Sequence, residues 1–193
     1  HPTIVTNDSY LKIIKKLLEK HKFKKYCIIL EPIKKNTSAA IALACINNAA
    51  NLPTIIFPSD HLIENEKKFN NTLKKNKRFI YQKNHFNKKD IFIFGIKPKN
   101  PSDQYGYFLS KKKPVGTKKI SKFIEKPRIS KAKKIIKMGG YWNSGILFGS
   151  IEAFYNSFLK HDPYTWSYCF ESIIKSKFLD NDEDRVIVKI NKK

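Results

Sequence analysis

The sequence predicts an α/β fold in which an open, mostly parallel sheet carries helices on both faces and a small antiparallel insertion. Short apolar runs of strand length alternate with segments of helical periodicity along the chain. Some runs, such as Leu52–Phe57, are continuously apolar, which is typical of strands covered on both faces. The chain has 193 residues, of which 41% are hydrophobic, so it can bury one sizeable core and a single domain is expected.

In the first part of the chain, expected strands and helices alternate. Pro2–Thr6 and Tyr26–Leu30 are short apolar runs and are expected to be buried strands. Between them, Ser9–Lys20 has apolar residues three and four positions apart, which predicts an amphipathic helix. Thr37–Ala50 is rich in small apolar residues and is expected to be a helix packed closely on the sheet. Leu52–Phe57, bounded by prolines, is the next strand.

The remaining elements continue this alternation. The expected strands are apolar runs at Ile91–Ile96, Tyr105–Leu109, Ile120–Ile124 and Gly145–Phe148. The expected helices are segments of helical periodicity at Lys67–Lys77, Ser130–Met138, Ile151–Leu159 and Tyr164–Lys175. Pro114 and Gly116 lie in a lysine-rich turn between two of these strands, which together are expected to form the antiparallel hairpin.

Polar residues and glycines mark the expected helix ends. Asp8 or Ser9 is the expected N-cap of the first helix, because a short side-chain oxygen can accept a hydrogen bond from a free backbone N–H. Thr37 and Ser130 are expected to cap two later helices in the same way. The pair Gly139-Gly140 is expected to end the helix that Ser130 begins.

The chain is strongly basic, with 39 Lys and Arg residues against 16 Asp and Glu residues and a formal charge of +23. This charge suggests nucleic-acid binding, but the only arginines are Arg78, Arg128 and Arg185, and phosphate and base recognition usually uses arginine. The lysines are spread as pairs over the whole chain. We therefore expect solvated lysine faces and no nucleic-acid partner, with a dedicated polyanion-binding surface as the alternative.

The sequence also gives little indication of a membrane span, a signal peptide or a cysteine-based site. No apolar stretch approaches the roughly 18 residues of a membrane span, and no signal peptide opens the chain, so a soluble cytoplasmic protein with no membrane partner is expected. The three cysteines, Cys27, Cys45 and Cys169, are odd in number and lack zinc-site spacing. They are expected to be reduced thiols in the core.

Polar residues that follow apolar runs are the candidate site residues, because ligands bind beyond the carboxyl ends of the strands in open α/β sheets. They are Glu31, Asp60, His61, Gly106, Glu125, Lys126 and Asn143. Each also has a structural interpretation. Asp60 and Asn143 suit turns or caps, His61 suits a structural role, and the Glu125-Lys126 pair suits a solvated edge. The sequence contains no P-loop, dinucleotide fingerprint, zincin motif or nucleophile elbow.

Five segments, in order, resemble the mannose-1-phosphate guanylyltransferase family of sugar nucleotidyltransferases. LEPIKKNTSAAIALA at residues 30–44 resembles the family's EPxxRNTAPAIALAA, and FPSDHLI at 57–63 resembles LPADHxI. FGIKP at 94–98 with YGY at 105–107 is similar to FGIxPxxPETGYGY. FIEKP at 123–127 and YWNSGI at 141–146 are similar to FxEKP and YxWNSGMF. The resemblance covers nearly the whole chain and implies the Rossmann-like sheet of the nucleotide-diphospho-sugar transferases.

The resemblance implies transfer of GMP from GTP to mannose 1-phosphate, which gives GDP-mannose and pyrophosphate for surface polysaccharide synthesis. It implies that Asp60 holds Mg²⁺ and, with Lys126 at the sugar's phosphate, serves catalysis. Glu31 would accept from the two adjacent guanine donors, with its alternative role a carboxylate at a helix entry. The other implied substrate-binding residues are Asn36 and Thr37 along the base and ribose, and Gly106, Glu125 and Asn143 around mannose. Trp142 is expected to pack beneath the site, with a sugar-stacking platform as the alternative. The oligomeric state stays open, with a homo-oligomer as one alternative.

The chain also departs from the family pattern. The glycine-rich loop of the type GGSGTRLWPLSR and the later WSDVGSW segment have no match here, so we expect the central fragment of a catalytic domain that is inactive alone. Lys35, Ser38 and Ala39 replace the family's Arg, Ala and Pro. The alternative functions are transfer to another hexose 1-phosphate and a non-catalytic polyanion-binding module.

Overall fold

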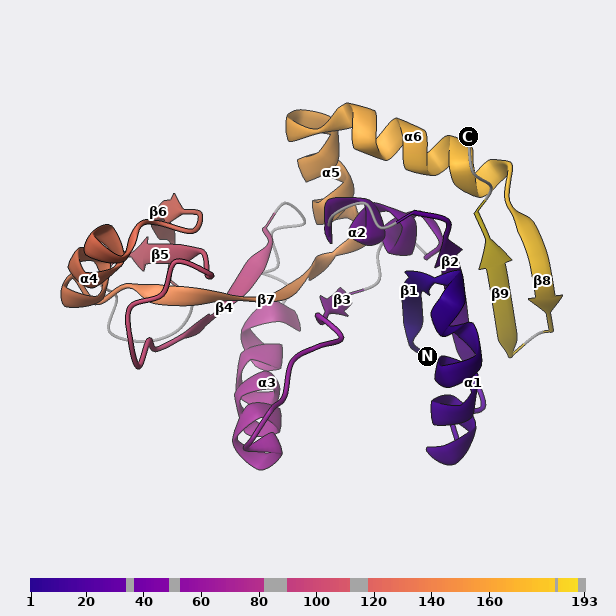
Figure 1. Ribbon diagram of the computed structural model, residues 1–193, viewed down its shortest axis with the longest axis horizontal. Helices are drawn as coiled ribbons and strands as arrows, with labels where there is room; N and C mark the ends of the chain where they lie inside the picture. The colour runs from indigo at the N-terminus through magenta and orange to yellow at the C-terminus, as the bar shows by residue number, and fades with distance from the viewer. Residues whose placement is uncertain (34–36, 49–52, 82–89, 112–117, 183, 191–193) are drawn as a thin grey trace. The chain divides into compact units, whose positions relative to one another are not determined.

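The computed structural model describes residues 1–33, 37–48, 53–81, 90–111, 118–182 and 184–190. These residues form two compact units, one of His1–Pro53 with Ser150–Lys193 and one of Thr54–Gly149. The α/β fold class expected from the sequence is confirmed, with strands in two sheets (Figure 1).

The first unit is built on a sheet with strand order β1-β2-β9-β8 (Figure 1). Its strands are β1 (Thr3–Asn7), β2 (Tyr26–Glu31), β8 (Lys177–Asn181) and β9 (Arg185–Lys189). β2 pairs in parallel with both β1 and β9, and β8 is antiparallel to β9. The helices are the 3-10 turn η1 (Asp8–Tyr10), α1 (Leu11–Lys20), α2 (Thr37–Ile46), α5 (Ile151–His161) and α6 (Pro163–Ile174).

Helices cover both faces of this sheet. Successive side chains of β2 point to opposite faces, so apolar residues on each face pack against helices. Ile28 and Leu30 are fully buried in a cluster with Leu18 of α1. Ile29, also fully buried, lies in a second cluster with Phe158 of α5 and with residues of α2 and α6. Each such side chain contributes roughly 1.5–3 kcal/mol of burial. This confirms the strand expected at Tyr26–Leu30 and the helices expected on both faces of a sheet.

The second unit contains a five-stranded sheet with order β3-β7-β5-β6, in which β4 also pairs with β7. Its strands are β3 (Pro53–Ile56), β4 (Phe92–Ile96), β5 (Tyr107–Ser110), β6 (Ile120–Ile124) and β7 (Tyr141–Ser150), and its helices are α3 (Glu66–Tyr81) and α4 (Ile129–Lys137). β5 and β6 form the expected hairpin. β7 is longer than expected and also pairs antiparallel with β4 and β5, so the antiparallel part is larger than a hairpin.

Several expected boundaries were wrong in detail. Asn7, not Asp8 or Ser9, caps the first helical turn, because β1 runs one residue further than expected and the Asn7 carbonyl oxygen Oδ1 accepts from the Ser9 N–H. α4 begins at Ile129 after Arg128, without a side-chain cap, so Ser130 lies inside the helix. Thr37 is the first helical residue of α2.

The predicted stop at Gly139-Gly140 is confirmed. Gly139 has φ +78°, and its N–H and that of Gly140 donate to the carbonyls of Ile136 and Ile135. No helix in the described ranges is long and apolar enough to cross a membrane.

Candidate functional site

The two faces of the β5-β6-β7 sheet carry different kinds of residue. Tyr107 pairs with Ile124 and with Trp142, and these side chains pack against α4. Directly opposed residues share a face, and successive residues along a strand point to opposite faces. Phe108, which pairs with Phe123 and Tyr141, therefore points away from α4.

Three predicted site residues continue the face that points away from α4. Gly106, Glu125 and Asn143 each lie two positions from Phe108, Phe123 or Tyr141, so they share that face. A Cβ atom on Gly106 would lie 2.7 Å from Glu125 Oε2 and 3.6 Å from Asn143 Cβ. The backbone N–H of Asn143 donates to the Gly106 carbonyl at 2.8 Å. The structure thus brings together Gly106, Glu125 and Asn143, which we call the glycine cluster.

The buried ring of Tyr107 anchors the loop that leads to Gly106. Its hydroxyl donates to the Ser102 carbonyl at 3.0 Å and accepts from the Ser102 N–H at 2.9 Å. The ring itself is fully buried and lies 6.4 Å from the Trp142 ring. Trp142 also contacts Tyr105 at 4.9 Å, on the α4 side of the sheet, so it packs beneath the glycine cluster as expected.

An Asx-type turn within β7, where its pairing register with β4 shifts, connects this cluster to the Asp60 segment. Asn143 Oδ1 accepts from the Gly145 N–H at 3.0 Å, as the turn interpretation of Asn143 expected. Gly145 has φ +71°, and a Cβ there would lie 3.0 Å from Pro58 Cγ and 4.0 Å from His61 Cε1. The Pro58–His61 segment therefore lies against this turn, and the Asp60 side chain within it is exposed.

Lys126 follows Glu125 in an unusual backbone conformation. Its φ is +37°, in the left-handed region, which costs a residue with a side chain roughly 1–2 kcal/mol. The next residue, Pro127, is buried, whereas Glu125 and Lys126 are both exposed. The chain thus turns sharply after β6, at the residue next to the glycine cluster. Strain of this kind is often found at functional sites.

In the first unit, the parallel strands β1, β2 and β9 bring their carboxyl ends to one edge. Glu31 ends β2 there and is half-buried. Asn7 Nδ2 donates to the Glu31 carbonyl at 3.1 Å, and Lys189 Nζ bonds Asp8 Oδ2 at 2.6 Å. Thr37 opens α2 and is exposed, and Asn36 lies outside the described residues.

Burial raises the pKa of all three cysteine thiols. Burial raises the pKa of Cys169 above its ordinary value, and the negative charges of Asp162 and Glu31 raise it further. Burial also raises the pKa of Cys27, against a hydrogen bond from Asn47, and raises that of Cys45 to about 12. All three cysteines are free and buried, as expected, and a protonated thiol is a poor nucleophile or metal ligand.

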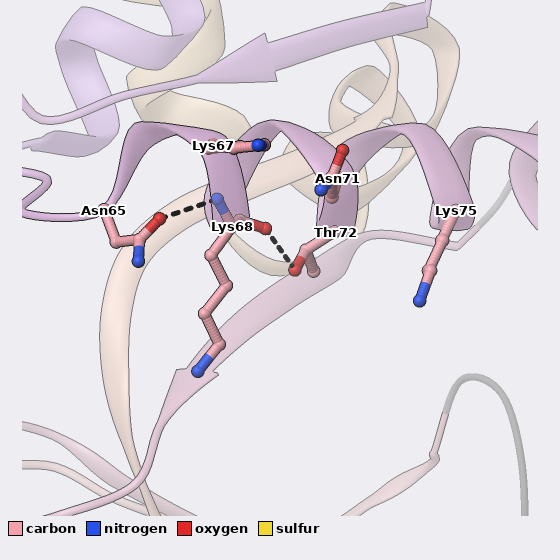
Figure 2. Close-up of a pocket in the computed structure, with 6 residues that line it drawn as sticks. All are labelled: Asn65, Lys67, Lys68, Asn71, Thr72 and Lys75. Carbon is pink, nitrogen blue, oxygen red and sulfur yellow. Dashed lines mark hydrogen bonds between the residues drawn. The ribbon is translucent and has the colours of Figure 1, made fainter.

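The described residues contain no group of three or more His, Cys, Asp or Glu side chains that could enclose a metal ion. A hollow on the outer face of α3 contains none of the predicted site residues (Figure 2). It is lined by Asn65, Lys67, Lys68, Asn71, Thr72 and Lys75. The dashed bonds in Figure 2 are ordinary helix contacts: Asn65 Oδ1 accepts from the Lys68 N–H at the helix start, and Thr72 Oγ1 donates to the Lys68 carbonyl one turn back within the helix.

Three residues near the predicted sites were missed in the sequence analysis. Phe123 shares a strand face with Glu125, and alternation along the predicted strand could have indicated it. Asn7 was placed outside the first strand, so its bond to the end of β2 was not anticipated. Gly145 was placed at the start of a strand, with a turn at Asn143 as the alternative, but its close approach to Pro58 was not anticipated.

Comparisons with known proteins agree with the fold. A family described as "Nucleotidyl transferase" matches residues 1–179. The alginate biosynthesis protein AlgA of Pseudomonas aeruginosa is 28% identical over 91% of this chain and 37% of its own length. A mannose-1-phosphate guanylyltransferase of Escherichia coli is 29% identical over 98% of this chain and 42% of its own length. A crystal structure described as mannose-6-phosphate isomerase from Helicobacter pylori superposes with a TM-score of 0.84 at 27% identity, over 98% of this chain and 72% of that one. The chain thus spans less than half the length of the AlgA and guanylyltransferase relatives.

Proposed function

The chain belongs to the nucleotidyltransferase family, and we propose that it takes part in transferring GMP from GTP to mannose 1-phosphate. An oxygen of the sugar phosphate attacks the α-phosphorus of GTP, the bond to the β-phosphate oxygen breaks, and GDP-mannose and pyrophosphate form. No covalent enzyme intermediate is needed, so the tasks of the protein are positioning and charge neutralisation. The name of the Escherichia coli relative, mannose-1-phosphate guanylyltransferase, supports this choice of substrates.

The glycine cluster carries the proposal. An exposed carboxylate beside a glycine gives a hexose both a hydrogen-bond acceptor for its hydroxyl groups and close access to the backbone. A Cβ at Gly106 would lie 2.7 Å from Glu125 Oε2, so a side chain at that position would displace the carboxylate. Asn143, held by its turn, lies beside them. Lys126, exposed next to Glu125, is suited to bind the phosphate of the sugar as a point charge.

The proposed base site is the carboxyl edge of the parallel strands in the first unit. Guanine presents N1–H and N2–H donors side by side, and an ionised carboxylate can accept from both. Glu31 lies at this edge, half-buried, at the end of β2. Thr37 and Asn36 would contact the ribose and base at the start of α2.

Asp60 is the proposed magnesium ligand. Its carboxylate is exposed at the carboxyl end of β3, and Mg²⁺ commonly takes one or two carboxylates, with water and phosphate oxygens completing its shell. A lone exposed carboxylate therefore fits an ion shared with the substrates. The chemistry that Mg²⁺ supplies when bound is neutralisation of charge between two anionic reactants. Asp60 would hold the ion and orient it. The Pro58–His61 segment keeps Asp60 beside the Asn143 turn.

Calorimetric titrations of the full chain test the proposal. Mannose 1-phosphate should bind. Glu125→Gln should weaken this binding roughly tenfold, and the exposed control Glu64→Gln should leave the affinity unchanged. GTP with Mg²⁺ should bind more tightly than UTP or dTTP. Glu31→Gln should reduce this preference and Glu19→Gln should not. Asp60→Asn should reduce the dependence of GTP binding on Mg²⁺.

Two results would overturn the proposal. One is that neither GTP nor mannose 1-phosphate binds the wild-type chain. The other is that RNA or DNA binds with a steep loss of affinity in salt while both small substrates fail, which is the behaviour of a polyanion-binding module.

A further inference from the structure

Phe123 is a large apolar side chain that the second unit leaves partly exposed beside the glycine cluster. It is 44% exposed and lies on β6, two residues before Glu125. Its ring atom Cζ lies 3.0 Å from the position of a Cβ on Gly106. The aromatic ring and the Glu125 carboxylate therefore flank the same glycine from one strand.

The surrounding packing does not enclose this ring. Phe108, its directly opposed partner on β5, is only 6% exposed and stacks on Tyr141 with ring centroids 5.8 Å apart. On the other face, Ile124 packs toward α4. Phe108 and Tyr141 thus complete the apolar packing of this face, whereas Phe123 keeps nearly half of its surface open.

We infer that Phe123 forms the apolar wall of the hexose site and contacts a C–H face of the sugar whose hydroxyl groups Glu125 binds; this rests on the proposed function. A hexose has hydroxyl groups around its edge and patches of C–H on its faces. The face of an aromatic ring carries negative charge density, to which polarised C–H groups are attracted. Ligand sites commonly combine an apolar wall with a few polar groups that fix orientation.

This arrangement assigns different roles to the two side chains. Glu125 recognises hydroxyl groups, and Phe123 selects which face of the ring lies against the strand. Phe123 is therefore a specificity-determining residue for the sugar and has no part in binding GTP. Removing the ring should weaken hexose binding roughly tenfold, within the range expected for lost apolar contact in a pocket.

NMR spectroscopy and titration of the full chain test the inference. In the wild type, nuclear Overhauser effects should connect the C–H protons of mannose 1-phosphate with aromatic ring protons that are absent from Phe123→Leu. Those C–H protons should also shift upfield on binding. Phe123→Leu should bind mannose 1-phosphate roughly tenfold more weakly and lose the upfield shift, while Phe123→Tyr should retain both and GTP affinity should stay unchanged in each.

Phe92→Leu is the matched control, because Phe92 pairs with Phe148 on β4 and β7 of the same unit and not with the glycine cluster. It should bind mannose 1-phosphate like the wild type. Wild-type binding without aromatic contacts to the sugar, or equal affinity in Phe123→Leu, would overturn the inference and leave the proposed function intact. Absence of mannose 1-phosphate binding in the wild type would overturn both. If Phe123→Leu does not fold, the wild-type contacts and the Phe123→Tyr titration still decide.

Discussion

Replacing Gly106 with alanine is expected to damage hexose binding much more than folding. The added methyl group would lie 2.7 Å from Glu125 Oε2 and 3.0 Å from Phe123 Cζ. Both are ends of exposed side chains, and the backbone of Gly106 lies outside the left-handed region. The protein can therefore accept the methyl group by moving the Glu125 carboxylate.

The distances set the size of the effect. Ordinary contact begins at 3.4 Å, so the carboxylate oxygen must retreat by about 0.7 Å, toward solvent. Such a movement of an exposed side chain should cost less than about 1 kcal/mol in the free energy of unfolding. A hydrogen bond to a charged group contributes about 1.5–3 kcal/mol, so its loss should weaken mannose 1-phosphate binding by about 10- to 150-fold.

Titration calorimetry with mannose 1-phosphate and urea denaturation check the two halves of this prediction. Gly140→Ala is the control, because its Cβ would contact Ile135 Cγ2 and would lie 2.9 Å from the Ile135 carbonyl oxygen, which is backbone and cannot move away. Gly140→Ala should lose about 1–3 kcal/mol of stability, while the folded fraction binds the sugar normally. Wild-type affinity in Gly106→Ala, or a stability loss equal to that of Gly140→Ala, would refute the reasoning.

Four further predictions concern the core and the surroundings of the proposed sites. Ile29→Ala should lower the free energy of unfolding in urea by about 2–5 kcal/mol, because the side chain is fully buried, whereas Ile13→Ala, 57% exposed, should change it by less than about 0.5 kcal/mol; similar losses would contradict the described core. Burial raises the pKa of Cys45 from 9.0 to about 12, so above pH 9 the folded chain keeps a proton that the unfolded chain releases. The contribution of this thiol to the free energy of unfolding should therefore be fully present below pH 9 and be lost as the pH rises toward 12. The fall from this thiol is about 1.4 kcal/mol per pH unit, and Cys45→Ala should reduce the slope in urea titrations at pH 8, 9 and 10. Lys126→Gly should be more stable than Lys126→Ala by about 1 kcal/mol in thermal melts, because φ is +37°; equal stability would exclude the left-handed conformation. Tyr107→Phe removes both hydroxyl hydrogen bonds to the loop before Gly106 and should cost about 1 kcal/mol each while weakening mannose 1-phosphate binding, and unchanged binding would show that this loop needs no anchor.

The elements that the sequence predicted best are those whose pattern is local. Ile120–Ile124 matches β6 to the residue, and the apolar run at Tyr26–Leu30 differs from β2 by one residue. β9 (Arg185–Lys189) was missed, since a lysine and an arginine bound its short apolar run. Its strand character depends on pairing with β2 in parallel, and a single sequence does not show that distant contact.

The sequence also did not predict whether neighbouring strands are parallel or antiparallel. The run at Ile91–Ile96 is fully apolar, which suits a strand buried on both faces in either a parallel or an antiparallel sheet. β4 pairs antiparallel with β7, which extends back to Tyr141 rather than beginning at Gly145. The antiparallel part of the fold was therefore underestimated.

The geometry of the glycine cluster follows from register and not from residue type alone. Glu125 and Phe123 reach the same glycine because β6 alternates and pairs Phe123 with Phe108. A register shift of one residue would exchange Glu125 and Phe123 with their neighbours and turn them toward α4. Packing of Ile124 against the Tyr107, Ala132 and Ile135 cluster opposes that shift, because the shift would remove Ile124 from this core and turn the charged Glu125 toward α4. The apolar core on one face of this sheet thus determines which side chains stand on the other, and the proposed sugar site depends on packing that no ligand would touch.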